Sequence, residues 1–185
     1  MKRSFQSVLD LEIHDFFAYI KTIRYGYRDT LGRLHVLSPA DSYNEKDGKY
    51  AFSSPEDVVA DQSGWCWDVA NLIAEYCESH NIEHKNIFME YDSEELHQTH
   101  TQVFLHFCEK WYEAPDNSSP CVFGASAYSD ADTCIAAFVS TFVTYLKSVL
   151  KENYRDQNLL VKEFRCPISR GISDEQYLEL LRNTT

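Results

Sequence analysis

The chain has 185 residues, which is enough for one ordinary domain with a substantial core and leaves no clear room for two. Hydrophobic residues make up 44% and aromatic residues 14%, so a globular fold is favoured over a disordered chain. The formal net charge of -12, without a run of lysine or arginine, argues against nucleic acid as a partner.

The N-terminus and the cysteines indicate a cytoplasmic protein. Residues 1–7 begin with positive charge but lead into Asp10 and Glu12 instead of an apolar signal core, so export by a standard signal is not supported. Six cysteines are scattered without a Cys-x-x-Cys pair, which suits reduced thiols better than a disulfide framework. They are Cys66, Cys77, Cys108, Cys121, Cys134 and Cys166.

The longest apolar run extends over residues 134–146. It contains Ser140, Thr141 and Thr144 and is too short to cross roughly 30 Å of hydrocarbon. The run therefore predicts a core helix, and we expect no membrane association.

The first part of the chain predicts a helix, then short strands, then a second helix. Apolar residues recur at helical spacing over residues 7–24, and Tyr25-Gly26-Tyr27 is expected to end that helix. The segment that follows, up to Ser54, has the glycine, proline and asparagine content of short strands and loops. Ser54, followed by Pro55 and two acids, has the pattern of a capped helix start.

The central part predicts a helix followed by strands. Over residues 65–80, small and apolar residues fall on one stripe and polar residues on another, which is typical of an amphipathic helix. Residues 108–109 are expected to join two of the later strands as a hairpin. The segments with strand composition are residues 87–91, 101–107 and 110–113.

The last part predicts a long helix, a strand and a short helix. Residues 129–132 form a capping pattern ahead of an apolar stripe made of Ile135, Phe138, Val139, Phe142, Leu146 and Val149. A strand follows at about residues 159–164, and a capping pattern at Ser173 starts a short helix. Together these elements predict an α+β domain in which a helix packs on an antiparallel sheet.

Residues 63–68, with the sequence SGWCWD, place Cys66 between two tryptophans where a glycine turn opens the helix over residues 65–80. A thiol at a helix N-terminus lies at the positive end of the peptide dipole, which favours the thiolate. Asp68 has a structural explanation, because an acid in the first helical turn complements that dipole. Cys66 is therefore a candidate nucleophile, although a buried structural thiol is the alternative for the residue taken alone.

A histidine and a carboxylate follow Cys66 in the order that thiol catalysis needs. A cysteine nucleophile requires an imidazole to carry its proton and a group that orients the imidazole. His100 begins a predicted strand, and Asp116 lies at the end of the next one. We therefore expect Cys66, His100 and Asp116 to form a triad.

Three blocks of residues carry a resemblance to a known family. The sequences GWCWDVA at residues 64–70, THTQVF at 99–104 and KWYEAPD at 110–116 occur in the family's order. Over about residues 55–130 the chain resembles the transglutaminase-like branch of the papain-like cysteine protease superfamily, and in particular small bacterial transglutaminase-like proteins. The resemblance covers the centre of what we expect to be a single domain over residues 1–185.

The resemblance implies a papain-like α+β core and assigns roles to the triad. Cys66 would be the nucleophile, His100 the base and acid, and Asp116 the orienter, with Glu113 as the alternative orienter. The backbone N–H of Cys66 is the natural first donor to an oxyanion, and Gln62 or Trp65 is a candidate for the second. No cofactor or metal is implied.

Several residues keep two explanations open. His97, His100 and His106 lie in one region, but their spacing gives no convincing tetrahedral zinc set. Trp65 and Trp67 can line a substrate cleft or belong to the core.

The leading functional hypothesis is a thiol-dependent acyl-transfer enzyme that acts on a peptide or protein substrate. Hydrolysis of an amide or peptide bond, as by a cysteine protease, isopeptidase or deamidase, is the default, and cross-linking to an amine is a further possibility. The alternative is a non-catalytic papain-like scaffold that binds a protein or peptide. An arylamine acetyltransferase-like activity ranks last, because residues 61–64 lack the arginine-glycine-glycine lead-in to the cysteine. The oligomeric state is left open.

Overall fold

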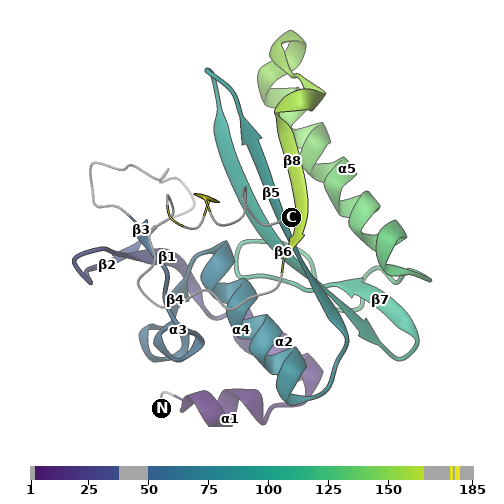
Figure 1. Ribbon diagram of the computed structural model, residues 1–185. Coiled ribbons are helices and arrows are strands. Elements are labelled where there is room, and N and C mark those ends of the chain that lie inside the picture. The colour runs from purple at the N-terminus through teal and green to yellow at the C-terminus, as the bar shows by residue number, and fades with distance from the viewer. Residues whose placement is uncertain (1–2, 38–49, 165–175, 177, 180–185) are drawn as a thin grey trace.

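The computed structural model describes residues 3–37, 50–164, 176, 178 and 179. Helices and two mixed or antiparallel sheets alternate along the chain, so the predicted α+β class is confirmed. Figure 1 shows α5 on one side of the larger sheet and α4 with the N-terminal helices on the other. The predicted helix from Ser173 lies outside the described residues.

The N-terminal segment forms two helices, α1 (Phe5–Leu9) and α2 (Ile13–Ile20), so the single helix expected over residues 7–24 is wrong. The chain turns at Glu12, which has extended backbone angles and begins the second helix. Apolar spacing continues through this turn because both helices bury their apolar side chains in one core cluster. Periodicity alone therefore does not reveal the break.

The smaller sheet contains three antiparallel strands in the order β2 (Leu34–Val36), β1 (Arg24–Asp29) and β3 (Tyr50–Ala51). The short strand β4 (Ser63–Gly64) pairs with β1 in parallel and puts Tyr25 beside Gly64. Tyr25-Gly26-Tyr27 therefore belongs to a strand, and the expectation that it ends a helix is wrong. Tyr25 and Tyr27 point to the same face of the strand and both pack on Trp65, which accounts for the strand.

Helix α3 (Pro55–Asp61) begins as its sequence predicts. The Ser54 side chain accepts from the backbone of Asp57, and the Asp57 carboxylate accepts from the backbone of Ser54 at 3.2 Å. Pro55 occupies the first helical turn, where no backbone donor is lost. Helix α4 (Cys66–Ser79) then confirms the amphipathic helix expected over residues 65–80.

The larger sheet is antiparallel, in the order β7 (Lys110–Glu113), β6 (His97–Phe107), β5 (His84–Asp92) and β8 (Leu159–Phe164). The predicted hairpin between β6 and β7 is confirmed, and both turn residues, Cys108 and Glu109, have positive φ. Along β6, Val103 and Leu105 face the cluster built on α4, whereas Phe104 faces the cluster built on α5. The sheet is thus a middle layer between helices.

Helix α5 (Ala131–Leu150) is less buried than the predicted core helix. Asp130 caps it, and Phe138 and Phe142 pack only partly against the sheet, while Val149 is 50% exposed. Within residues 131–153, a stretch of 18 residues has a mean hydropathy of 1.5 and is 17% buried, so this helix is long and apolar enough to span a membrane by those criteria alone. One face of the helix covers the sheet. Its apolar residues extend beyond that face, so some of them stay exposed.

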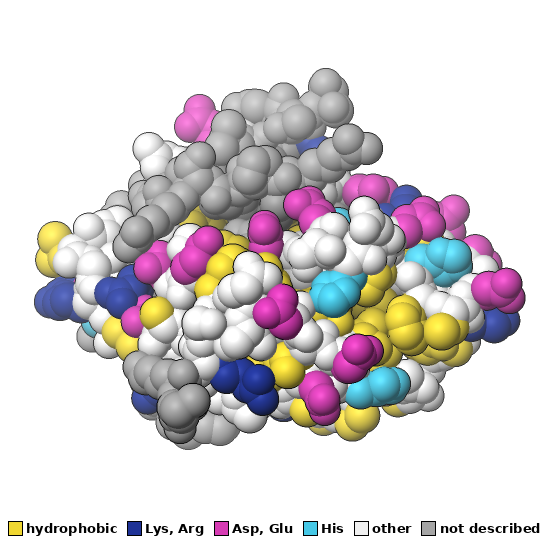
Figure 2. Space-filling view, turned by 90° about the horizontal axis from the view of Figure 1, so that it is seen from below, with side chains coloured by type: hydrophobic (Ala, Val, Ile, Leu, Met, Phe, Trp, Pro, Cys, Tyr) yellow, Lys and Arg dark blue, Asp and Glu magenta, His cyan; other side chains and the backbone are white. Residues whose placement is uncertain are grey.

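Acidic side chains are prominent on one face of the molecule. Figure 2 shows Asp and Glu side chains spread over the face in view, whereas Lys and Arg gather in a few places. This distribution agrees with the net charge of -12.

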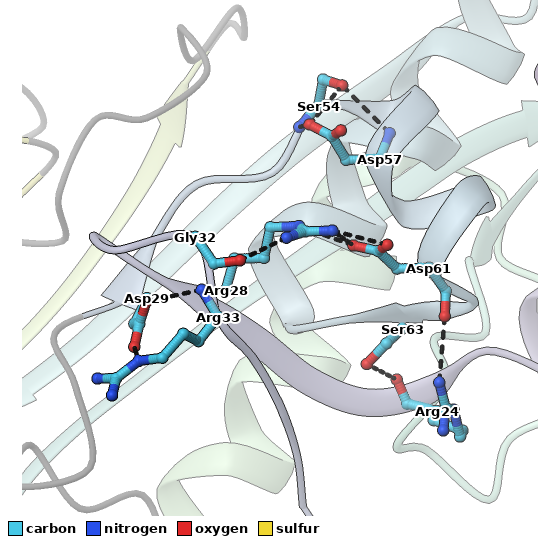
Figure 3. A network of polar contacts seen from close by, with 9 residues as sticks. All are labelled: Arg24, Arg28, Asp29, Gly32, Arg33, Ser54, Asp57, Asp61 and Ser63. Atoms are coloured by element: carbon cyan, nitrogen blue, oxygen red, sulfur yellow. Dashed lines mark hydrogen bonds and ion pairs between the residues drawn. The ribbon is translucent and has the colours of Figure 1, made fainter.

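Arginine side chains hold β1 against the end of α3 (Figure 3). Arg28 pairs with Asp61 through Nε and Nη2, each 2.8 Å from a carboxylate oxygen. Arg24 donates to the backbone carbonyl oxygens of Asp61 and Gln62 at 3.1 and 3.3 Å, and Ser63 Oγ donates to the Arg24 carbonyl oxygen at 3.2 Å. These contacts fix the register between β1 and β4, immediately before Cys66.

Gly26 lies where β1 passes close to β2 and β4. A Cβ at this position would collide with the His35 carbonyl oxygen and with Ser63 Oγ. We expect Gly26→Ala to lower the free energy of unfolding by roughly 1–3 kcal/mol, because backbone must shift to admit the methyl group. Urea unfolding of the variant and the wild type measures this difference, and equal stability would contradict the close packing.

Candidate active site

Cys66 is the first residue of α4 and is 1% exposed. Backbone groups of Thr101 on β6 and of Trp67 on α4 act on its pKa, and the Tyr25 ring on β1 packs on the neighbouring Trp65 at 5.5 Å between ring centroids. Cys66 therefore lies where the start of α4 approaches strands β6 and β1. Its position at the helix start agrees with the prediction, whereas the approach of β1 was not foreseen.

Burial raises the pKa of the Cys66 thiol above its ordinary value, and the carboxylates of Asp116 and Asp68 add to that rise. The N–H donors of Thr101 and Trp67 act in the opposite direction but are outweighed. Loss of hydration thus exceeds the stabilisation that the helix N-terminus offers to an anion. Burial therefore opposes the resting thiolate that the helix start by itself predicts.

Asp116 is 3% exposed and is oriented by its own turn. Its Oδ1 accepts from the backbone N–H groups of Ser118 and Ser119 at 2.7 and 2.5 Å, and from Ser118 Oγ at 2.9 Å. This leaves Oδ2 as a buried oxygen for which the described residues provide no hydrogen-bond donor. Oδ2 lies 3.7 Å from Nε2 of His100.

Two contacts hold the loop that carries Asp116 near the start of α4. Lys21, at the end of α2, donates to the Asp116 carbonyl oxygen at 2.8 Å and also to that of Ser119. Asn117 Nδ2 donates to the Gly64 carbonyl oxygen at 2.9 Å. The loop is therefore joined to the residues that directly precede Cys66.

The His100 ring lies near the end of β6 that extends beyond its partner β7. Nε2 donates to Gln102 Oε1 at 3.4 Å and faces Asp116 Oδ2, while the ring stacks on Phe138 at 5.7 Å between centroids. A proton on Nε2 leaves Nδ1 with the lone pair that a base requires. Burial lowers the pKa of His100, against the opposing charge of Asp116, so the imidazole is neutral near pH 7.

The structure thus brings His100 and Asp116 together, and Asp116 acts on the pKa of Cys66. The His100 ring stacks on Phe138 of α5, and among the described contacts no hydrogen bond joins the imidazole to the Cys66 sulfur. Glu113, the alternative orienter, lies on β7 opposite Phe104, where burial raises the pKa of its carboxyl. The carboxylate that faces His100 is Asp116.

Gln62 is engaged elsewhere. Its Nε2 donates to the Tyr19 hydroxyl at 2.5 Å and to the Val59 carbonyl oxygen at 2.8 Å, which uses both amide hydrogens. Its backbone is left-handed, with φ of 53°, because it caps the end of α3. Gln62 therefore joins α3 to α2 and has no N–H left for an oxyanion.

The two tryptophans differ in their surroundings. Trp67 is 5% exposed and stacks on Phe52 at 4.8 Å, so it is a core residue. Trp65 is half-buried, and its ring meets those of Tyr25 and Tyr50 at 5.5 Å each. These rings form an aromatic layer between the smaller sheet and the start of α4.

Asp68 joins three segments below this layer. Its carboxylate accepts from the Tyr50 hydroxyl at 2.6 Å, from the Ser53 N–H at 3.0 Å and from the Trp65 N–H at 3.2 Å. The last contact caps α4, as the sequence predicts, and the first two tie strand β3 and the start of the α3 segment to the same carboxylate.

The three histidines of β6 have separate carboxylate partners. His97 contacts Glu90 at 3.0 Å, and His106 contacts Glu83 at 3.3 Å. Among the residues that the structure describes, no group of three or more His, Cys, Asp and Glu side chains is arranged to hold a metal ion. The described cysteines are all free thiols, namely Cys66, Cys77, Cys108, Cys121 and Cys134.

Sequence reasoning missed Tyr25, Asn117 and Lys21 as residues of the site. Alternating aromatics around Gly26, with an arginine on either side, are typical of a strand and could have indicated one here. Asn117 belongs to a turn-forming Pro-Asp-Asn-Ser stretch. Lys21 carries no local signal, because its partners are distant in the sequence.

No protein-family model matches the chain, and no curated protein sequence matches it. What the site can do is therefore inferred from its residues and their geometry. The resemblance carried by the blocks at residues 64–70, 99–104 and 110–116 stays a prediction.

Burial raises the pKa of Asp68 to about 7, so the folded protein keeps a proton that the unfolded chain, with a value of 3.8, has lost. Between about pH 4 and 7 the free energy of unfolding should fall as pH rises, by up to about 1.4 kcal/mol per pH unit. Asp68→Asn removes this contribution. We expect urea unfolding to show a flatter pH dependence for the variant than for the wild type and for the exposed control Asp132→Asn. Equal slopes would contradict a protonated Asp68.

Proposed function

We propose that the protein is a thiol-dependent acyl-transfer enzyme with a papain-like, transglutaminase-like core, and that its main activity is hydrolysis of amide or peptide bonds. The observation that carries the proposal is Asp116 Oδ2, a buried carboxylate oxygen that receives no hydrogen bond from the described residues and faces His100 Nε2 at 3.7 Å. A desolvated carboxylate of this kind stabilises an imidazolium when the ring takes up a proton. That need arises if His100 acts as a base.

The protonation states support general-base catalysis. The Cys66 thiol is neutral and the imidazole is neutral, so the thiol proton passes to His100 as the sulfur attacks. The sulfur–carbon bond forms while the carbonyl π electrons move onto oxygen. On collapse the C=O bond re-forms, the bond to the leaving amine breaks, and the imidazolium gives that amine its proton.

The resulting thioester on Cys66 is then resolved by a second nucleophile. Water attacks with His100 as base, releases the acid and restores the thiol. An amine in place of water would give cross-linking. Peptide and protein amides are the substrate class that this chemistry fits.

One observation favours the alternative, a non-catalytic scaffold of the same fold. Cys66 is 1% exposed and its pKa is raised, as for a structural thiol. A scaffold, however, has no use for a buried carboxylate oxygen that faces an imidazole. Catalysis therefore explains more of the described contacts, and kinetics separate the two functions.

We expect p-nitrophenyl acetate to acetylate Cys66 in the wild type, with the acetyl group located by mass spectrometry. Cys66→Ala should abolish this reaction, and His100→Ala should slow it by about 10²–10⁴-fold through loss of the general base. The matched control is His106→Ala on the same strand, which should keep the wild-type rate. Acetylation that is independent of His100 would contradict the proposal. Incubation with a peptide library, read for cleaved, deamidated and amine-labelled products, then identifies the acceptor.

The pH profile tests the pairing of His100 with Asp116. Because burial lowers the pKa of His100 from 6.5, we expect the acidic limb of kcat/KM for the ester to lie below pH 6.5. Asp116→Asn removes the charge that favours the imidazolium, so this limb should move further toward acid while the plateau rate falls. A limb that stays in place would mean that Asp116 does not act on His100.

A further inference from the structure

Gln102 is a buried polar side chain, 2% exposed, on the face of β6 that also carries His100. The two residues share this face because side chains alternate along a strand. The Gln102 amide nitrogen donates to the carbonyl oxygen of Ala114 and, at 3.3 Å, to that of Val103. Carbonyl groups only accept hydrogen bonds, so the amide is oriented with its nitrogen toward them and its oxygen, Oε1, toward His100.

The orientation of this amide fixes the proton on His100. Oε1 of Gln102 lies 3.4 Å from Nε2 of the imidazole, and it only accepts a hydrogen bond. A neutral imidazole carries one N–H, so Nε2 is the protonated nitrogen and Nδ1 keeps its lone pair. Two backbone carbonyl oxygens thus determine, through Gln102, which ring nitrogen is free to take up a proton.

The other contacts of the ring do not make this selection. Phe138 stacks on the imidazole at an interplanar angle of 28° and so holds the plane of the ring. A half-turn about the bond between Cβ and the ring keeps that plane and exchanges its two edges. Asp116 Oδ2 is 3.7 Å from Nε2, which is beyond hydrogen-bond distance. Among the residues that the structure describes, Gln102 is therefore the hydrogen-bond partner that distinguishes the two ring orientations.

We infer that Gln102 is a positioning residue of the candidate active site, which holds the Nε2–H of resting His100 and leaves Nδ1 as the base. When Nδ1 takes the proton of the Cys66 thiol, the ring becomes an imidazolium and its attraction to the Asp116 carboxylate increases. The proton on Nε2 stays in place throughout, so the proton and electron count of the reaction is unchanged. This inference rests on the proposed acyl-transfer function.

A purely structural role for Gln102 is the alternative that the test has to separate. Strand β7 ends at Glu113, and the Gln102 amide satisfies the carbonyl oxygen of the next residue, Ala114. That contact alone could explain a buried glutamine. It needs only the amide nitrogen, however, whereas the positioning role also needs the amide oxygen. The positioning role therefore predicts a change in the ionisation of His100.

The test uses full-length Gln102→Leu, which removes both amide groups, with Gln98→Leu on the same strand as the matched control. Nitrogen-15 NMR of the His100 ring during a pH titration reports both its tautomer and its pKa. In the wild type we expect neutral His100 to carry its proton on Nε2. In Gln102→Leu we expect the tautomer protonated on Nδ1 to appear. The pKa of His100 should fall by roughly 0.5–1 pH unit, because the lost acceptor stabilises the charged ring more than the neutral one.

Acetylation of Cys66 by p-nitrophenyl acetate supplies the functional readout. We expect Gln102→Leu to lower kcat about tenfold with little change in KM, because its hydrogen bond acts on the base and not on binding of the ester. The acidic limb of kcat/KM should move toward acid together with the pKa measured by NMR. Gln98→Leu should match the wild type in every measurement.

Three outcomes would overturn the inference. The first is wild-type His100 with its proton on Nδ1. The second is a Gln102→Leu variant in which the tautomer and pKa of His100 are those of the wild type, which would leave Gln102 the structural role alone whether or not activity falls. The third is a wild type that does not acetylate Cys66, which would overturn the proposed function as well. The first two leave that function intact.

Asp116→Asn tests the same point if Gln102→Leu does not fold. Gln102 is unchanged in this variant, so the neutral ring should keep its proton on Nε2 even though the facing charge is lost. A proton that moves to Nδ1 in Asp116→Asn would assign the selection of the tautomer to Asp116 and overturn the inference.

Discussion

The carboxylate of Asp68 is the constraint on which the candidate site depends. It is buried and accepts from Tyr50, from the backbone of Ser53 and from the backbone of Trp65. A buried carboxyl group is costly unless its oxygens are hydrogen-bonded, so the three donors have to stay together in the folded state. Their convergence joins strand β3, the approach to α3 and the start of α4. It thereby fixes the place of Cys66, two residues before Asp68.

Burial and activation oppose each other at Cys66. The helix N-terminus and two N–H donors favour a thiolate, whereas removal from water and two nearby carboxylates favour the neutral thiol, and the second group prevails. The same burial lowers the pKa of His100, and Asp116 Oδ2 faces it without a hydrogen-bond donor from the part of the chain that the structure describes. In the proposed function the pair transfers a proton during attack, and the imidazolium charge that then develops is met by Asp116. A dry site makes each of these electrostatic contacts stronger than it would be in water.

Most elements could be predicted because their signals are local. The capping pair Ser54 and Asp57, the amphipathic stripe of α4 and the hairpin turn at residues 108–109 all depend on neighbours a few positions apart. The errors occur where packing overrides such signals. Helical spacing runs on through Glu12, although the chain turns there so that both helices reach one core. Similarly, the apolar length of α5 suggested a core helix, yet only one of its faces meets the sheet.

The sequence by itself determined the α+β class and the start of a helix at Cys66, since both follow from residues adjacent in the chain. Only the tertiary structure decided what surrounds Cys66. Tyr25 on β1, Thr101 on β6 and the loop held by Lys21 come together because two sheets pack around the start of α4. The protonation state of Cys66 was decided in the same way. A pKa depends on water excluded by distant segments as well as on the local helix dipole, and that exclusion is not encoded in any single stretch of sequence.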